Sequence, residues 1–245
     1  MSRTSSYHVW DSINNGAIVF ESLTDDTFEG ALNVIRKSFF VYENVCKAVD
    51  ILSESGASKE LEELCLDAAK DGVSVVAVFV FQLLKNSSEK STFEIFKENC
   101  KCNSSKALID FMINIDSRID LFKRYNTDCI FEIMFLATLP PNQKCRIGEL
   151  LITSSIKIAE ELKKGNPVKT PVMINNVNTI ENLKTVPNVA SAIMTSNYSQ
   201  KIAAKCGFEN LLSISYDEFH FNKKIFSENI GDEHRNCILV AKKLS

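Results

Sequence analysis

The sequence predicts one mixed α/β domain, in which strands and helices alternate in the middle of the chain and strands dominate its end. Three observations favour this fold class. A strand-like run at 129–139 passes through a proline turn into an amphipathic helix. Other strand-like and helical runs alternate on both sides of it. No internal repeat or linker-like stretch divides residues 1–245, so we expect a single domain over that range.

The first half of the chain shows apolar periodicities typical of two strands and three helices. The strands are expected at Gly16–Leu23 and Val73–Phe81, and the polar stretches Lys85–Ser91 and Asn99–Asn103 are expected to be loops. The helices are expected after the capping residues Thr24–Asp26, at Ser58–Ala69 before Gly72, and at Ser105–Tyr125.

The second half is organised around the strand Cys129–Leu139, which leads through Pro140-Pro-Asn142 into a helix with apolar residues at a period close to 3.6. An open helix start after a strand attracts anions, because unpaired N–H groups and the helix dipole point there. The remaining expected elements are a short strand Val172–Ile174, a loop or turn-containing insertion Asn175–Pro187, a strand Val189–Met194, a helix Asn197–Cys206 closed by Gly207, strands Leu211–Tyr216 and Cys237–Val240, and a loop Glu218–Arg235.

Composition excludes several classes of protein. Of the 245 residues, 45% are apolar and 24% charged, as in a soluble globular protein. A net charge of −3 with no Lys/Arg run longer than two gives no reason to expect nucleic-acid binding. The longest apolar run, Val73–Phe81, is about half a membrane span. The N-terminus lacks a signal peptide, so we expect a cytoplasmic protein with eight reduced cysteines. Cys100 and Cys102 have no second ligand pair nearby in sequence, so no metal site is expected.

Two segments carry motifs that occur in this order in one enzyme superfamily. Gln143-Lys-Cys-Arg-Ile-Gly148 is similar to a (Gln/Arg)-x-x-Gly-x-(Gly/Ala) coenzyme-A motif, and Ser196–Phe208 is similar to a helix that ends in Gly-Phe. Both motifs belong to the GNAT superfamily of N-acetyltransferases. More narrowly, Phe39–Val45 and Thr195–Ser199 resemble segments of insect arylalkylamine and dopamine N-acetyltransferase-like proteins. The resemblance implies a GNAT-like domain whose central sheet is mixed, mostly antiparallel and twisted, with flanking helices.

Three positions depart from the family pattern. Arg146 stands where the motif has its first glycine. We expect an arginine to be tolerated there only if its backbone stays helical and its side chain points away. Its charge can also add to a phosphate site. Ala203 stands where the family often has a Tyr proposed to protonate the departing thiolate, so another group or water must do so. The segment Tyr42–Val45 keeps only the Glu of an Asp-Glu-Pro-Leu motif.

The resemblance assigns catalysis to three residues. An amine is protonated at neutral pH, so acetyl transfer needs a base, and this role falls to Glu43. The alternative is a solvated Glu at a helix end. Thr195 and Ser199 match hydroxyls suspected of positioning substrate or protonating the thiolate, whereas capping of the following helix by Thr195 or Ser196 suits these side chains equally well. Tyr198 is either a core aromatic or a hydrogen-bond donor.

The resemblance also implies acetyl-CoA as co-substrate, bound mainly by backbone groups and without a metal. The pantetheine arm is expected to pair with the strand at Leu136, Ala137 and Thr138. The pyrophosphate is expected to meet the helix start formed by Gln143, Lys144, Cys145, Arg146, Ile147, Gly148 and Glu149. Cys145 is poorly placed in such a turn to reach the thioester and has no His near it in sequence, so no acetyl-enzyme is expected.

These inferences favour an acetyl-CoA-dependent N-acetyltransferase that acts on a small primary amine, an arylalkylamine or a polyamine-like compound, by direct attack in a ternary complex. Two alternatives stay open: a non-catalytic acyl-CoA-binding regulatory protein, and an N-acetyltransferase for proteins or peptides. The expected partners are the amine and coenzyme A, without nucleic acid or membrane, and the expected state is a monomer or weak dimer.

Overall fold

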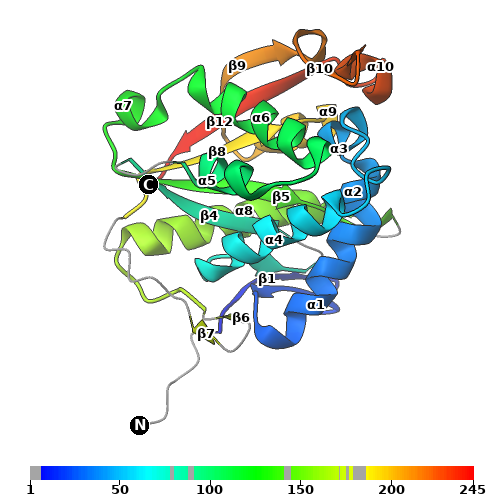
Figure 1. The fold of residues 1–245 in the computed structure, drawn as a ribbon. Coiled ribbons are helices and arrows are strands. Elements are labelled where there is room, and N and C mark those ends of the chain that lie inside the picture. The colour runs from blue at the N-terminus through cyan, green and yellow to red at the C-terminus, as the bar shows by residue number, and fades with distance from the viewer. Residues whose placement is uncertain are drawn as a thin grey trace.

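An eight-stranded sheet forms the centre of the molecule (Figure 1). The computed structural model describes residues 7–77, 80–87, 91–140, 145–170, 172–174, 177–178 and 186–245. In spatial order the strands are β1 (Val9–Ile13), β2 (Ile18–Ser22), β3 (Val75–Val76), β4 (Val80–Asn86), β5 (Cys129–Leu136), β8 (Val189–Met194), β12 (Asn236–Lys243) and β9 (Glu209–Ser215). Neighbouring strands are antiparallel except β5 and β8, which are parallel. The expected mixed, mostly antiparallel sheet is therefore confirmed.

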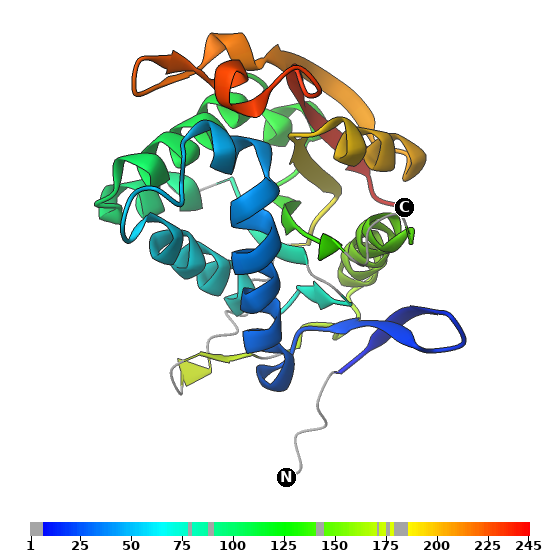
Figure 2. The same ribbon diagram turned by 90° about the vertical axis from the view of Figure 1, so that its right-hand side faces the viewer.

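Helices cover both faces of the sheet (Figure 2). One face carries α8 (Ile147–Lys163) and α9 (Asn197–Lys205). The opposite face carries α1 (Asp25–Val34), the π-helical turn η1 (Ile35–Phe39), α2 (Phe40–Tyr42), α3 (Asn44–Ala48), α4 (Ala57–Lys70), α5 (Thr92–Asn99), α6 (Asn103–Ser117), α7 (Leu121–Tyr125) and α10 (Phe226–Ile230). No helix within the described ranges is long and apolar enough to cross a membrane.

Two small hairpins accompany the main sheet: β6 (Met173–Ile174) with β7 (Val177–Asn178), and β10 (His220–Phe221) with β11 (Lys224–Ile225). The 3-10 turn η3 (Tyr216–Glu218) follows β9, and β10, β11 and α10 lie within the stretch Glu218–Arg235 that the sequence predicts as a loop. Phe219 and Phe226 pack against Phe111 of α6, with ring centroids 4.8 and 5.9 Å away. These aromatic contacts pack the C-terminal segment against α6, although its overall composition is polar and predicts a loop.

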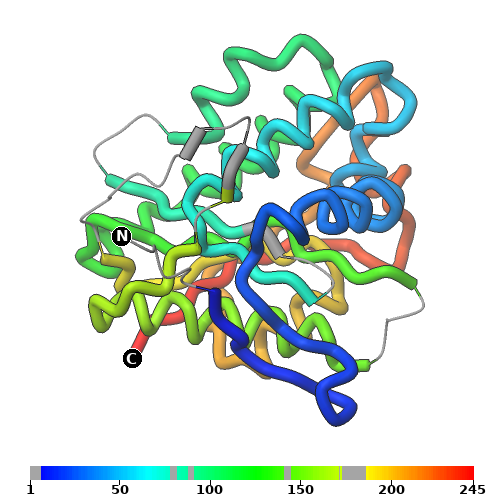
Figure 3. Tube along the Cα trace, turned by 90° about the horizontal axis from the view of Figure 1, so that it is seen from below, coloured from blue at the N-terminus to red at the C-terminus, as the bar shows by residue number. Residues whose placement is uncertain are grey.

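Apolar side chains from both helix layers pack against the sheet in one large cluster. Among its largest fully buried members are Phe20, Phe111, Phe131 and Tyr216, which come from β2, α6, β5 and η3. A buried Phe contributes about 1.5–3 kcal/mol of burial free energy. At the sheet edge, Lys157 of α8 donates to the Trp10 carbonyl at 3.0 Å and thereby holds the β1–β2 hairpin beside α8 (Figure 3).

The single strand expected at Val73–Phe81 is wrong. The chain instead forms β3, turns, and returns antiparallel as β4, which continues to Asn86 through residues expected to be a loop. An apolar run longer than one strand does not reveal where the chain reverses. Lys85 belongs to β4, where it pairs with Ile130, and its ammonium group lies 2.6 Å from Glu132 and 2.5 Å from Asp116.

The long helix expected at Ser105–Tyr125 is divided into α6 and α7. Asp120 lies between them in an extended conformation, and its carboxylate accepts a hydrogen bond from the Lys123 N–H at 3.0 Å. An Asp at an N-cap starts a new helix, although the apolar periodicity on either side is continuous. Ser91 and Glu94 form a capping box that starts α5, a helix absent from the sequence prediction although its Ser-x-x-Glu signal is present.

Candidate active site

The parallel strands β5 and β8 separate at their carboxyl ends. Their shared ladder covers only Ile130–Glu132 of β5 and Val189–Ser191 of β8. Beyond it, Ile133 and Leu136 still pair with β4 on the other side. The β5–β8 ladder therefore ends at Glu132, and an extended ligand can pair with strand backbone beyond the end of such a ladder.

The segment that follows β5 is tied to the first helix layer. Leu136 is half-buried and Ala137 is buried, and the Thr138 carbonyl accepts a hydrogen bond from the Ser38 hydroxyl at 2.8 Å. Ser38 lies in η1, where Phe39 also packs edge-on against Phe135 at 5.2 Å. The π-helical turn thus fixes the part of the chain expected to meet the pantetheine arm. π-helical turns occur frequently at functional sites.

Arg146 adopts a left-handed conformation, with φ 62° and ψ 8°, at the N-cap of α8. The expectation that its backbone stays helical is wrong, because this is the region that glycine enters without steric cost. The expectation that its side chain points away holds: it is 72% exposed and its guanidinium lies 2.7 Å from Glu149. The hydrogen bond from Arg146 lowers the pKa of the Glu149 carboxyl.

The first turn of α8 has no side-chain cap from Arg146. The first intrahelical bond from this turn joins the Leu150 N–H to the Arg146 carbonyl at 3.0 Å. The N–H groups of Ile147, Gly148 and Glu149 therefore have no intrahelical acceptor. Cys145 before the helix is exposed. Gln143 and Lys144, also expected to contact coenzyme, lie outside the described residues.

Gly148 allows α8 and α9 to approach each other closely. A Cβ atom at this position would lie 3.1 Å from Ile202 Cδ1, tighter than an ordinary van der Waals contact. The Lys205 ammonium near the end of α9 lies 3.7 Å from Glu149. The second glycine of the motif therefore has a packing role, which brings the two motif helices together.

Glu43 lies in an extended conformation between α2 and α3. Its Oε2 accepts a hydrogen bond from the Cys46 N–H at 2.7 Å and so caps α3. Its Oε1 is buried and has no hydrogen-bond partner among the described residues. Glu43 therefore lies at a helix end, as the alternative of a solvated glutamate expects, but its second carboxylate oxygen is not in contact with water.

Thr195 and Ser199 lie where β8 passes into α9. Ser196 is the N-cap of α9, as one of the expected capping alternatives proposes, and its Oγ accepts from the Ser199 N–H at 3.1 Å. The Ser199 hydroxyl accepts in turn from the Ser196 N–H at 3.2 Å. Ser199 thus completes a capping box. The Thr195 carbonyl accepts hydrogen bonds from Asn44 and Tyr216, each at 2.6 Å.

The start of α9 also meets the segment before β12. The Tyr198 side chain is 60% exposed, so it is not a core aromatic, and its hydroxyl donates to Glu233. This bond raises the pKa of Tyr198. The ring of His234 packs edge-on against Tyr198 at 5.5 Å, and its Nδ1 accepts from the Asn197 N–H at 3.3 Å. No sequence signal identifies His234 or Tyr216 as part of this region.

The structure brings the predicted segments together around the opening between β5 and β8. Asn44 joins the Glu43 segment to the end of β8, and Gly148 joins the start of α8 to α9. In Figure 1, α2 and α3 lie at the same end of the sheet as the carboxyl end of β5. The expected base and the described part of the expected coenzyme-binding segment therefore flank one opening.

Solved structures provide the decisive comparison for this arrangement. Arylalkylamine N-acetyltransferase 2 from Aedes aegypti superposes with a TM-score of 0.73 at 20% identity, covering 94% of this chain and 100% of that one. A mosquito arylalkylamine N-acetyltransferase like 5b gives 0.71 at 16% identity, over 93% and 100%. The polyamine N-acetyltransferase of Drosophila melanogaster gives 0.67 at 13% identity, over 93% and 100%.

The chain has the GNAT fold. No protein-family model matches it, and no curated protein sequence matches it. The GNAT resemblance read from two short motifs is thus confirmed at the level of fold. At 20% identity or less, the sequence similarity to these three structures is too low to transfer residue roles.

The GNAT sheet contains a buried ionic cluster beside its opening. Glu132, 2% exposed, is the last β5 residue paired with β8, and it shares the Lys85 ammonium with Asp116. Burial raises the pKa of Glu132 to about 7, against the opposing effect of Lys85. Lys85 also lies 4.8 Å from the Phe93 ring. This cluster explains how two charged residues occupy central strands.

We expect this cluster to make stability fall as pH rises from about 4.5 to about 7, because folded Glu132 retains a proton that the unfolded chain releases. Relative to wild type, Glu132→Gln should gain on the order of 2 kcal/mol of unfolding free energy between pH 5 and pH 8. Urea unfolding at several pH values measures this difference. Glu63→Gln, at an exposed helix position, is the control; a wild-type-like pH profile for Glu132→Gln would contradict the prediction.

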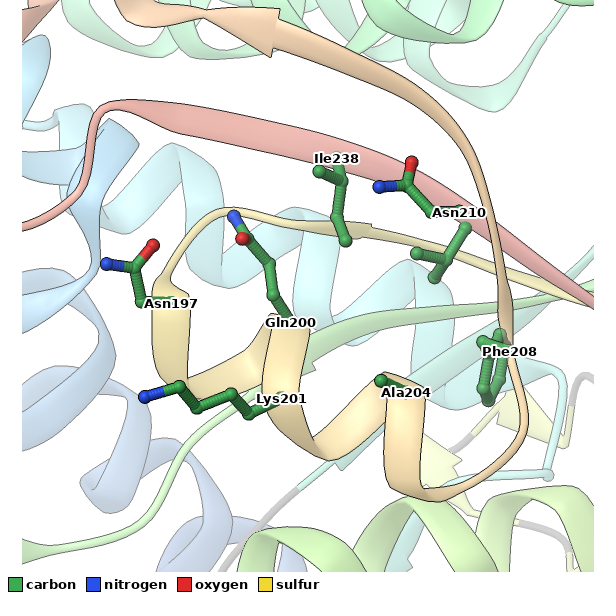
Figure 4. Close-up of a pocket in the computed structure, with 8 residues that line it drawn as sticks. Asn197, Gln200, Lys201, Ala204, Phe208, Asn210 and Ile238 are labelled. Carbon is green, nitrogen blue, oxygen red and sulfur yellow. The ribbon is translucent and has the colours of Figure 1, made fainter.

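A separate open pocket of about 330 Å³ lies on the face of α9 turned away from α8. Asn197, Gln200, Lys201 and Ala204 line it from α9, opposite Ile238 of β12 and Asn210 of β9 (Figure 4). The Gln200 amide already donates to the Asn236 carbonyl at 2.8 Å. Because Ile202 faces α8 from the other side of the helix, this pocket is distinct from the opening between β5 and β8.

Within the described part of the chain, no group of three or more His, Cys, Asp and Glu side chains is arranged to hold a metal ion.

Proposed function

We propose that this chain transfers the acetyl group of acetyl-CoA to the nitrogen of a small primary amine. The observation that carries the proposal is Glu43, which has one oxygen fixed by the Cys46 N–H and one buried oxygen without a partner among the described residues. Asn44 holds this segment against the end of β8, beside the opening between β5 and β8. A carboxylate held in this way is prepared to accept a proton from a substrate.

The coenzyme is proposed to lie along β5 beyond the end of its ladder with β8. Its pantetheine amides pair with backbone groups at Leu136, Ala137 and Thr138, and its pyrophosphate meets the N–H groups of Ile147, Gly148 and Glu149. The described residues fit such a ligand, because the β5–β8 ladder ends at Glu132, before Leu136, and Arg146 gives α8 no side-chain cap. Arg146 adds a positive charge next to these N–H groups.

The proposed reaction is direct attack in a ternary complex. Glu43 takes a proton from the ammonium group, directly or through water, and the freed nitrogen attacks the thioester carbonyl. The C–S bond then breaks, the nitrogen loses its second proton as the amide forms, and the coenzyme thiolate takes up a proton through Ser199, Thr195 or water. A Ser199 hydroxyl that donates its proton regains one from the nitrogen, directly or through water; its oxygen lies 3.0 Å from the Ser196 hydroxyl.

The amine is proposed to be an arylalkylamine or a polyamine-like compound. Two of the compared structures carry the name arylalkylamine N-acetyltransferase, and the third is called a polyamine N-acetyltransferase. These names support a panel of candidates: tyramine, dopamine, serotonin, agmatine and spermidine. Thiol release from acetyl-CoA with each amine tests the proposal.

Amine-dependent thiol release is the expected result. Absence of release with every amine would overturn the proposal. If titration calorimetry then detects acetyl-CoA binding, the chain is a non-catalytic acyl-CoA-binding protein instead. Turnover with a peptide amine alone would replace the small-amine substrate with a protein or peptide substrate.

We expect Arg146→Ala and Arg146→Gly to weaken acetyl-CoA binding about fivefold at low salt, because each removes one charge near the pyrophosphate. The effect should shrink at high salt. Titration calorimetry at two salt concentrations measures both changes. Gly suits the left-handed backbone at this position, whereas Ala does not. Equal weakening in the two variants identifies charge as the cause, and weakening in Arg146→Ala alone would assign the effect to the backbone.

A further inference from the structure

Asn44 connects the segment that carries Glu43 to the central sheet. Its side-chain amide donates to the Thr195 carbonyl at 2.6 Å, across 151 positions of sequence. The residue is 3% exposed and is the first residue of α3, directly after Glu43. Because the Asn44 side chain is buried, water does not readily replace it as the partner of the Thr195 carbonyl. The hydrogen bond therefore holds the end of β8 and the Glu43 backbone at a fixed separation.

Tyr216 binds the same carbonyl from a third segment. Its hydroxyl donates to the Thr195 oxygen at 2.6 Å, and its fully buried ring stacks on Phe111 at 6.2 Å. The Tyr216 N–H in turn donates to the Arg235 carbonyl at 3.1 Å. Both lone pairs of the Thr195 oxygen are therefore used, and α3, β8 and η3 meet at one atom.

Asn44 departs from the motif that its segment resembles. In the Asp-Glu-Pro-Leu motif that Tyr42–Val45 resembles, a proline stands where this chain has Asn44. Proline has no N–H and no side-chain donor, so it cannot make this bond. Proline is nevertheless well suited to the first residue of a helix, where the backbone N–H needs no intrahelical acceptor. A proline at position 44 thus removes the amide while preserving the start of α3.

We propose that Asn44 is a positioning residue, which acts through Glu43 by fixing the separation of the Glu43 carboxylate from the opening between β5 and β8. The inference rests on the proposed function, because it assumes that Glu43 is the base. Tyr216 supports Asn44 by restraining the carbonyl to which the amide is bound. Displacement of a catalytic group by about 1 Å can cost about 100-fold in rate.

The test compares Asn44→Ala and Asn44→Pro with wild type, and uses Asn229→Ala as a matched control. Asn229 is also an asparagine whose amide holds α3, but it binds the Ala48 carbonyl at 3.0 Å, at the opposite end of the helix from Glu43. Three quantities are measured: kcat per acetyl-CoA-binding site, acetyl-CoA affinity by titration calorimetry, and hydrogen exchange of the peptide that spans residues 40–48.

Both Asn44 variants should lower kcat about tenfold or more, with acetyl-CoA affinity within about twofold of wild type and faster exchange before residue 46. Asn229→Ala should keep kcat within about threefold of wild type, although it frees the other end of α3. A purely structural role would instead reduce the number of binding-competent sites and leave kcat per site unchanged.

Unchanged kcat and exchange in the Asn44 variants would overturn this inference alone, provided that wild type acetylates an amine. An equal loss of kcat in Asn229→Ala would also overturn it, because general loosening of α3 would then explain the effect. If wild type acetylates no amine, the proposed function fails, and the positioning role fails with it.

Discussion

Glu43→Gln should lower kcat for amine acetylation about 100-fold or more, while acetyl-CoA affinity and stability stay close to wild type. Glutamine keeps an oxygen that can accept from the Cys46 N–H, so the cap of α3 survives. It cannot take a proton from an ammonium group at neutral pH. The residual rate should rise with pH toward the pKa of the amine, because the free amine then needs no base. Steady-state kinetics across pH measure both effects.

Glu43→Ala is the companion variant, since it removes the base and the cap together. It should lose the same activity and, in addition, about 1 kcal/mol of unfolding free energy. Comparison of the two variants separates catalysis from helix capping. The assignment of Glu43 as base is wrong if Glu43→Gln retains the wild-type rate and pH profile.

Gly72→Ala should destabilise the protein by about 2–4 kcal/mol. Gly72 has a left-handed backbone with φ 67°, and a Cβ atom there would lie 2.7 Å from the Thr170 carbonyl oxygen. That oxygen belongs to the backbone, and the Thr170 N–H is also bound to the Gly72 carbonyl at 2.8 Å. The backbone at Thr170 cannot move away from residue 72 without breaking this hydrogen bond. Urea unfolding at fixed pH measures the loss.

Gly30→Ala provides a control of opposite sign. Gly30 lies within α1, and a Cβ atom added to it would meet no atom within 4 Å apart from the backbone of its own helix. Alanine there should stabilise the protein by about 0.5–1 kcal/mol, because it loses less backbone entropy on folding. Equal effects of the two substitutions would show that left-handed strain and close approach do not constrain Gly72.

Local chemistry in the sequence predicts much of the candidate site. Apolar periodicity places a strand and a helix on either side of 140–146, and the structure has β5 and α8 there. Ser196 is predictable as a helix cap because its hydroxyl can accept from an N–H three residues ahead, which requires no distant partner. The GNAT fold is predictable because two motif segments occur along the chain in the order typical of that fold.

The sequence does not predict contacts between distant segments. The left-handed backbone of Arg146 is not predictable, because an arginine in a glycine position gives no sign that the glycine conformation persists. The sequence predicts a loop at Lys85. It does not reveal the pairing of Lys85 with Glu132 and Asp116, because that pairing depends on how β4 and α6 pack against β5. The bond from Asn44 to Thr195 spans 151 positions and has no local signature.

By itself, the sequence determined the order of helices and strands around the opening, the cap at Ser196, and the helix end at Gly72, because these depend on interactions within a few residues. Only the tertiary structure decided that Glu43 has one bound oxygen and one without a partner among the described residues, and that Thr195 joins three segments. The physical reason is that hydrogen bonds shielded from water form between whichever polar groups packing brings together, and packing is a property of the whole chain.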